Sequence, residues 1–202
     1  MFDLSFLQIL SRAIAIILVL MVMGFSVAAL ARLFGDRSAV YDSKFTLNPF
    51  THIDIFAFAA GIIGRVGWVR PITIDPSQLR AGRAAPVIIA IGAMVAVFGL
   101  GRLAILALPW VATSWPASSA AFTDATLRMV ADISAWTLAL NIIPLPPLLG
   151  GYFLQALLPT AHAWLVKRSL YVSIALLVLV VLTYRFLPGS VMGDMARILG
   201  AR

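Results

Sequence analysis

The stretch that decides the fold of this chain is residues 141–151, with the sequence NIIPLPPLLGG. It follows an apolar run, at a point where a membrane-spanning helix would otherwise continue. Three prolines, Pro144, Pro146 and Pro147, interrupt that helix, because proline lacks the backbone N–H and its ring clashes with the preceding turn. Irregular backbone inside a membrane is tolerated only where protein or a water-filled cavity covers it. We therefore expect this stretch to form the wall of a buried site.

The composition around this stretch is that of an integral membrane protein. Of the 202 residues, 62% are hydrophobic and 11% are charged, whereas soluble domains carry about 25% charged residues. The net charge of +7 is therefore expected to mark cytoplasmic loops and not a nucleic-acid site. The chain has no cysteine, so it can form neither a disulfide framework nor a thiolate metal site. All eight acidic residues are aspartates, and glutamate is absent.

The apolar runs predict a single polytopic membrane domain over residues 1–202, α-helical, with four or five transmembrane helices. A span needs about 20 apolar residues. After a lead-in over residues 1–12, the expected spans are 13–34, 85–108, 127–143 and the C-terminal helix 169–187, while 53–69 either spans or is re-entrant. Asp3 interrupts the basic region of a signal peptide, so we expect the first span to be retained. Residues 44–47 and 70–74 read as two short strands that would pair into a small β element at the membrane face.

Basic residues are distributed unevenly among the expected loops. The loop 32–83 and the turn 160–168 contain lysines and arginines, whereas the loop 109–122 contains none. Because cytoplasmic loops carry an excess of Lys and Arg, the first two are expected on the cytoplasmic side.

Three sequence blocks together resemble the site-2 protease family of intramembrane zinc metalloproteases, in its small bacterial type. They are GDRSA at 35–39 followed by FTLNPFTHID at 45–54, GWVRPITIDP at 67–76 followed by Leu79-Arg80, and NIIPLPPL at 141–148 followed by Gly150-Gly151. The resemblance covers roughly residues 23–153. It implies a site-2-protease-like core over about residues 13–153 and a location in the bacterial cytoplasmic (inner) membrane.

The residues that carry the family's chemistry are different in this chain. The HExxH motif of the family falls on residues 23–27, where Met23 and Val27 replace the two histidine ligands and Gly24 replaces the glutamate base. Leu149 stands where the family has its aspartate ligand. With no glutamate anywhere, no shifted alignment restores the motif. The resemblance thus implies the fold, while the residues predict a pseudoprotease with no cofactor and a degenerate former site at Met23, Gly24, Val27 and Leu149.

Several other polar residues are candidates for binding or for structure. Asn141 matches a family asparagine that helps hold the substrate backbone, so it either binds an extended segment or caps the broken helix. The prolines 144, 146 and 147 either clamp a peptide or belong to the scaffold. His52 and Asp54 form an H-x-D pair that we expect to be structural, because a zinc site needs at least three protein ligands.

Charged residues within the apolar segments call for partners. Arg102 lies in the middle of an expected span and marks a functional site by default, with Asp132 as its candidate partner on another helix. Arg65 is expected to reach the interface with its guanidinium. Gly61, Gly64 and Gly67 are expected to serve close packing.

These features favour a non-catalytic membrane protein that keeps a protease fold as a binding surface. It would be an accessory, scaffold or regulatory subunit whose partners are other integral membrane proteins within the lipid bilayer. The alternative is an active intramembrane zinc metalloprotease that uses unrecognised ligands and cleaves membrane-embedded substrates. A third hypothesis is a transporter or lipid-handling protein that uses the emptied cavity.

Overall fold

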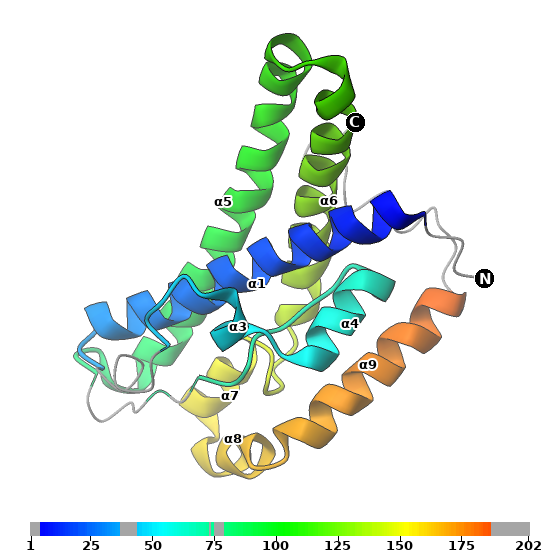
Figure 1. Ribbon diagram of the computed structural model, residues 1–202. Coiled ribbons are helices and arrows are strands. Elements are labelled where there is room, and N and C mark those ends of the chain that lie inside the picture. The colour runs from blue at the N-terminus through cyan, green and yellow to red at the C-terminus, as the bar shows by residue number, and fades with distance from the viewer. Residues whose placement is uncertain (1–4, 37–43, 73, 75–78, 187–202) are drawn as a thin grey trace.

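The computed structural model describes residues 5–36, 44–72, 74 and 79–186 (Figure 1). Within these ranges the chain is mostly helical and forms no β-strand, which confirms the helical class. The helices are α1 (Phe6–Leu33), α3 (Pro49–His52), α4 (Ile55–Gly64), the 3-10 turn η1 (Gly82–Ala84), α5 (Ala85–Ser114), α6 (Ala117–Asn141), α7 (Gly151–Leu157), α8 (Pro159–Val166) and α9 (Ser169–Phe186). The expectations for Arg37, Ser38, Ala39, Thr73, Asp75, Pro76 and the tail from residue 187 lie outside the described residues.

Helix α1 begins earlier than the apolar run suggested. The Ser5 hydroxyl accepts a hydrogen bond from the Gln8 N–H at 3.3 Å, and the Gln8 side chain accepts one from the Ser5 N–H at 3.1 Å. This capping box satisfies backbone donors that would otherwise be unpaired at the helix start. The lead-in that we predicted over residues 1–12 is therefore helical from Phe6 onward.

Helices α5 and α6 form a long hairpin that extends past α1 in Figure 1. Two helical segments are long and apolar enough to cross a membrane: Phe6–Leu33 and Gly82–Ser114. A third candidate arises if α8 and α9, bent by 78° at their junction, count as one span. The described residues thus give two or three candidates, not the four or five expected. Helix α6 is long enough but is less apolar, since it contains Asp124, Arg128 and Asp132.

Residues 53–69 form a hairpin whose two ends lie together. Helix α4 has only 10 residues, about 15 Å at 1.5 Å per residue. It ends at Arg65, which adopts a left-handed conformation with φ 59°, and the chain then returns in extended form. Ile53 and Val69 make an antiparallel β-bridge, and the Arg70 N–H donates to the His52 carbonyl at 3.0 Å. The two ends of this segment therefore lie side by side, and the segment is not one continuous helix.

The small β element expected from residues 44–47 and 70–74 does not form in the described residues, where the Ile53–Val69 bridge is the sole pairing. Side chains of α7 take the place of a partner strand. The Tyr152 hydroxyl donates to the Ile72 carbonyl and the Gln155 amide donates to the Ile74 carbonyl, each at 2.9 Å. The extended segment is thereby held against α7, while its link to residues 44–47 is a side-chain hydrogen bond from Lys44 Nζ to the Pro71 carbonyl at 3.4 Å and not a strand pairing.

Close helix packing explains the glycines of the hairpin. A Cβ placed on Gly67 would lie 2.7 Å from Ile16 Cδ1, and one placed on Gly61 would lie 2.9 Å from Ile16 Cβ. A Cβ on Gly64 would collide with Val180 of α9. The packing role expected for these three glycines is confirmed.

Candidate functional site

Residues 23–27 lie in the middle of α1, where Met23, Gly24 and Val27 are on the side that faces the protein interior. Met23 and Val27 are both fully buried, as expected for positions four residues apart on one helix face. Leu149, in the loop before α7, is buried in the same hydrophobic core cluster. The four positions 23, 24, 27 and 149 thus belong to a packed apolar interior.

Gly24 is covered by the imidazole ring of His52. A Cβ placed on Gly24 would lie 2.5 Å from His52 Cγ and 2.8 Å from His52 Cβ. Real Cβ atoms do not approach other heavy atoms this closely, so a larger residue at position 24 requires His52 to move. Sequence reasoning did not pair these two residues, because they belong to different elements, α1 and α3, and no local pattern connects them.

His52 is itself buried and held in place. Its Nε2 lies 2.9 Å from the Thr46 carbonyl, and since a carbonyl only accepts, Nε2 carries the proton and donates. Its Nδ1 has no hydrogen-bond partner within the described part of the chain. The ring therefore fills space over Gly24 and fastens α3 to the preceding loop.

Asp54 belongs to a different network from His52. Its Oδ1 accepts from the N–H groups of Phe56 and Ala57 at the start of α4, at 2.8 and 3.4 Å. Its Oδ2 accepts from the Ser173 hydroxyl at 3.0 Å, and that hydroxyl accepts from Trp68 Nε1 at 3.2 Å. Asp54 thus caps α4 and ties it to α9.

Asn141 uses its amide to join three parts of the chain. Its Nδ2 donates to the carbonyls of Gly67 and Thr137, both at 2.8 Å, and its Oδ1 accepts from the Leu149 N–H at 2.9 Å. The side chain is 1% exposed. The amide therefore joins the end of α6 to Gly67 and to the loop before α7, which is a structural role. Binding of a substrate or partner segment by Asn141 stays a prediction.

The proline loop turns sharply between α6 and α7. Pro144 is exposed, whereas Pro146 and Pro147 are buried. A Cβ placed on Gly150 would lie 2.5 Å from the Ile143 carbonyl carbon and 2.7 Å from the Ile142 oxygen, so this turn admits only glycine. Residues 146–151 are covered by protein, as expected from the sequence, whereas Ile142, Ile143 and Pro144 at the start of the irregular stretch are exposed.

Asp132 pairs with Arg65, and not with Arg102 as we expected. Arg65 Nη1 lies 2.6 Å from Asp132 Oδ2, with exposed side-chain fractions of 27% and 9%. The pair connects the tip of the 53–69 hairpin to α6. Arg65 does not simply extend to the interface. The sequence could not reveal this pair, because the contact depends on where the hairpin turns.

The side chains at the four positions that the resemblance aligns with the family's zinc ligands and base do not fit a zinc ion. Zinc is bound by Cys, His, Asp or Glu, and positions 23, 24, 27 and 149 carry none of these. In the ranges that the structure describes, no group of three or more such residues is close enough to hold a metal.

A curated protein is similar to this chain over most of its length. It is described as "Putative zinc metalloprotease YwhC" from Bacillus subtilis (strain 168) and is 28% identical over 158 residues, which cover 76% of this chain and 72% of the relative. This distant homologue supports the site-2-protease-like resemblance. No protein-family model matches the chain. No solved structure matches it either.

Proposed function

We propose that this protein is a non-catalytic, site-2-protease-like membrane protein. The observation that carries the proposal is the apolar packing of the former site: Met23, Val27 and Leu149 are buried in the core, and His52 occupies the space in which a residue at position 24 would place its side chain. A ligand cluster without metal would leave buried polar groups unpaired, each at a cost of about 1–3 kcal/mol. Apolar replacement removes that cost.

The same proposal assigns an accessory, scaffold or regulatory role among other integral membrane proteins of the bacterial cytoplasmic membrane. The hairpin of α5 and α6 supports this role, since it extends beyond α1 (Figure 1). Helix α5 exposes Leu103, Leu106 and Trp110 along its outer part. An apolar helical hairpin of this kind is a surface that another membrane helix can pack against.

We further propose that α6 crosses the membrane beside α5, so that four spans (α1, α5, α6 and α8–α9) accompany a re-entrant 53–69 hairpin. At 25 residues α6 extends about 37 Å, enough for the hydrocarbon core. Its charges are compensated, because Arg128 pairs with Asp124 at 2.8 Å and Arg65 with Asp132. Single cysteines at Ala121, near the start of α6, and at Ile142, directly after its end, test this topology without removal of native cysteines. Labelling of both from the same side of the membrane would contradict it.

The test of the proposed function is native mass spectrometry of the tagged protein, extracted in mild detergent from its own membranes. We expect a zinc-free mass with a stoichiometric membrane-protein companion. A zinc-free monomer without any companion would overturn the accessory role. A mass with one zinc would overturn the reading of the former site.

The alternative is an active intramembrane zinc metalloprotease, and the description of the distant relative favours it. It requires a ligand set outside positions 23, 24, 27 and 149. Zinc in the native spectrum, together with cleavage of a helical membrane substrate by the purified protein, would establish it.

A further inference from the structure

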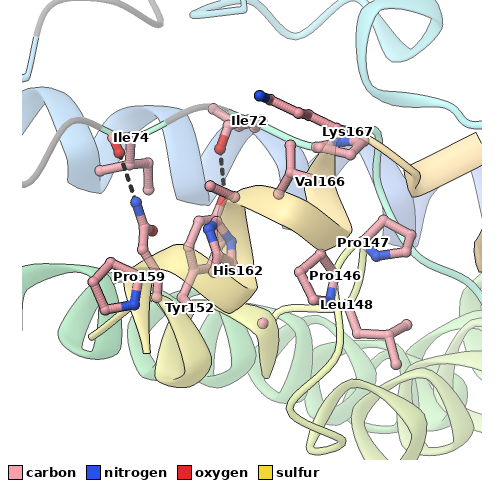
Figure 2. A pocket seen from close by; sticks show the side chains of 14 residues that line it. Ile72, Ile74, Pro146, Pro147, Leu148, Tyr152, Pro159, His162, Val166 and Lys167 are labelled. Atoms are coloured by element: carbon pink, nitrogen blue, oxygen red, sulfur yellow. Dashed lines mark hydrogen bonds between the residues drawn. The ribbon is translucent and has the colours of Figure 1, made fainter. Parts of the chain in front are cut away.

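A pocket of about 370 Å³ lies between the extended segment that begins at Pro71, the proline loop, α7 and α8 (Figure 2). It is distinct from the former site on α1. Its walls are mainly apolar and include Ile72, Pro146, Pro147, Leu148 and Val166. Ligand sites typically have about 300–1,000 Å³ and a mostly apolar lining with few polar groups. The dimensions and the lining of this pocket fit a small apolar body.

Two polar side chains of the wall, Tyr152 and Gln155, hold the wall together, and His162 also lines the pocket. Figure 2 shows the Tyr152 hydroxyl directed at the Ile72 carbonyl, and Gln155 donates from Nε2 to the Ile74 carbonyl, each at 2.9 Å. Burial raises the pKa of the Tyr152 phenol well above its usual value, so this hydroxyl remains a neutral donor. The other amide atom of Gln155, Oε1, is buried and has no hydrogen-bond partner in the described ranges.

This arrangement disfavours an extended peptide as the occupant. A peptide strand would gain affinity through main-chain hydrogen bonds to a sheet edge, but the carbonyls of Ile72 and Ile74 already accept from α7. The facing loop contributes prolines, which have no N–H to donate. An occupant without a backbone, such as an acyl chain, avoids both problems.

The rim of the pocket is basic and lies beside an interfacial anchor. Lys167, at the end of α8, is exposed and lines the pocket. The next residue, Arg168, places its guanidinium carbon 4.0 Å from the ring centroid of Trp164 and donates from Nη1 to the Trp164 carbonyl at 3.2 Å. Tryptophan with Lys and Arg is typical of the headgroup level of a membrane. A rim of this kind suits a lipid, and the charge of Lys167 favours an anionic one.

We propose that this pocket binds one anionic phospholipid, with part of an acyl chain between the extended segment and the proline loop and with the headgroup phosphate at Lys167. Basic residues near a membrane face each contribute about 1 kcal/mol toward anionic lipids. A single lysine at the phosphate thus corresponds to an affinity difference of about fivefold.

The experiment uses the full chain, delipidated in detergent and titrated with phosphatidylglycerol or with phosphatidylcholine of the same chains, with native mass spectrometry as the readout. We expect a one-to-one adduct with phosphatidylglycerol that Lys167→Gln weakens about fivefold. The matched control is Arg168→Gln, which removes the same charge from the neighbouring residue and should leave the adduct unchanged. Equal losses in both variants would indicate adsorption to a basic surface and would overturn the proposal.

A second variant tests the chain-binding part of the pocket. Ala163→Phe fills the pocket from α8 and should weaken binding of both lipids, whereas Ala125→Phe on the exposed side of α6 should not. Circular dichroism verifies that each variant remains helical. Undiminished binding to Ala163→Phe would overturn the proposal. Equally strong binding of glycerol phosphate, which has the charge but no chain, would assign a simple anion site instead, and a retained peptide mass would assign a protein ligand.

Discussion

The contact between Gly24 and His52 leads to a prediction with an unusual sign. In a helix interior, Gly→Ala ordinarily stabilises by about 1 kcal/mol, because glycine has the larger conformational entropy to lose. At position 24 the added Cβ would lie 2.5 Å from His52 Cγ and 2.8 Å from His52 Cβ. Overpacking of a tight interior costs about 1–3 kcal/mol. We therefore expect Gly24→Ala to destabilise the protein by up to about 2 kcal/mol.

The matched control is Gly99→Ala in α5, where a Cβ would meet no atom within 4 Å. This variant should stabilise by up to about 1 kcal/mol, so the two glycine variants should differ by about 1–3 kcal/mol. Equilibrium unfolding by guanidinium in detergent, followed by the far-UV signal, measures both.

A double-mutant cycle identifies the responsible side chain. The variant His52→Ala should be destabilised by itself, because it leaves a cavity and an unpaired Thr46 carbonyl. In that background Gly24→Ala should no longer be costly, and the coupling energy should be about 1–3 kcal/mol. If Gly24→Ala and Gly99→Ala behave alike, or if the cycle shows no coupling, then His52 does not occupy the space over position 24. That result would also contradict the proposal that the former site is permanently filled.

Three further substitutions test the contacts that hold the site region. Asp132→Asn should destabilise the protein by about 2–3 kcal/mol, because it leaves the partly buried Arg65 without its 2.6 Å partner. The double variant with Arg65→Gln should recover much of the lost stability in the unfolding assay, and no recovery would contradict the pairing. Asn141→Leu should cost about 3 kcal/mol in the same assay, since three buried groups bonded at 2.8–2.9 Å lose their partner, and a neutral effect would show that these bonds are dispensable. Gly150→Ala should destabilise the protein more than Gly24→Ala, because the obstructing atoms are backbone atoms of Ile142 and Ile143 and cannot change rotamer. Limited proteolysis of the purified variants measures this, and equal resistance of the two would contradict it.

Much of the coarse architecture could be predicted from local sequence. The long apolar runs indicated α1 and α5, because an apolar stretch of that length is stable as a helix in a membrane. The three prolines located the break after Asn141, and the spacing of Gly61, Gly64 and Gly67 indicated close packing. These inferences needed only covalent geometry and the period of the helix.

Helix boundaries and polar partners were less accessible to sequence reasoning. The start of α1 depended on a capping box at Ser5 and Gln8 that an apolar-run criterion ignores. The two strand-like segments had the alternation of polar and apolar residues that a strand requires. In the structure, however, the Ile72 and Ile74 carbonyls accept hydrogen bonds from Tyr152 and Gln155 of α7 and not from a partner strand. Local propensity could not anticipate donors from residues so far along the chain.

The sequence by itself indicated an α-helical membrane protein, and it established that residues 23, 24, 27 and 149 carry no zinc-binding side chain, because composition and residue identity set both. Only the tertiary structure decided that residues 53–69 turn back, that Arg65 meets Asp132, and that His52 covers Gly24. Each of these depends on distances between segments that are remote in the chain. Such distances follow from how the helices pack, and no local pattern of residue types contains them.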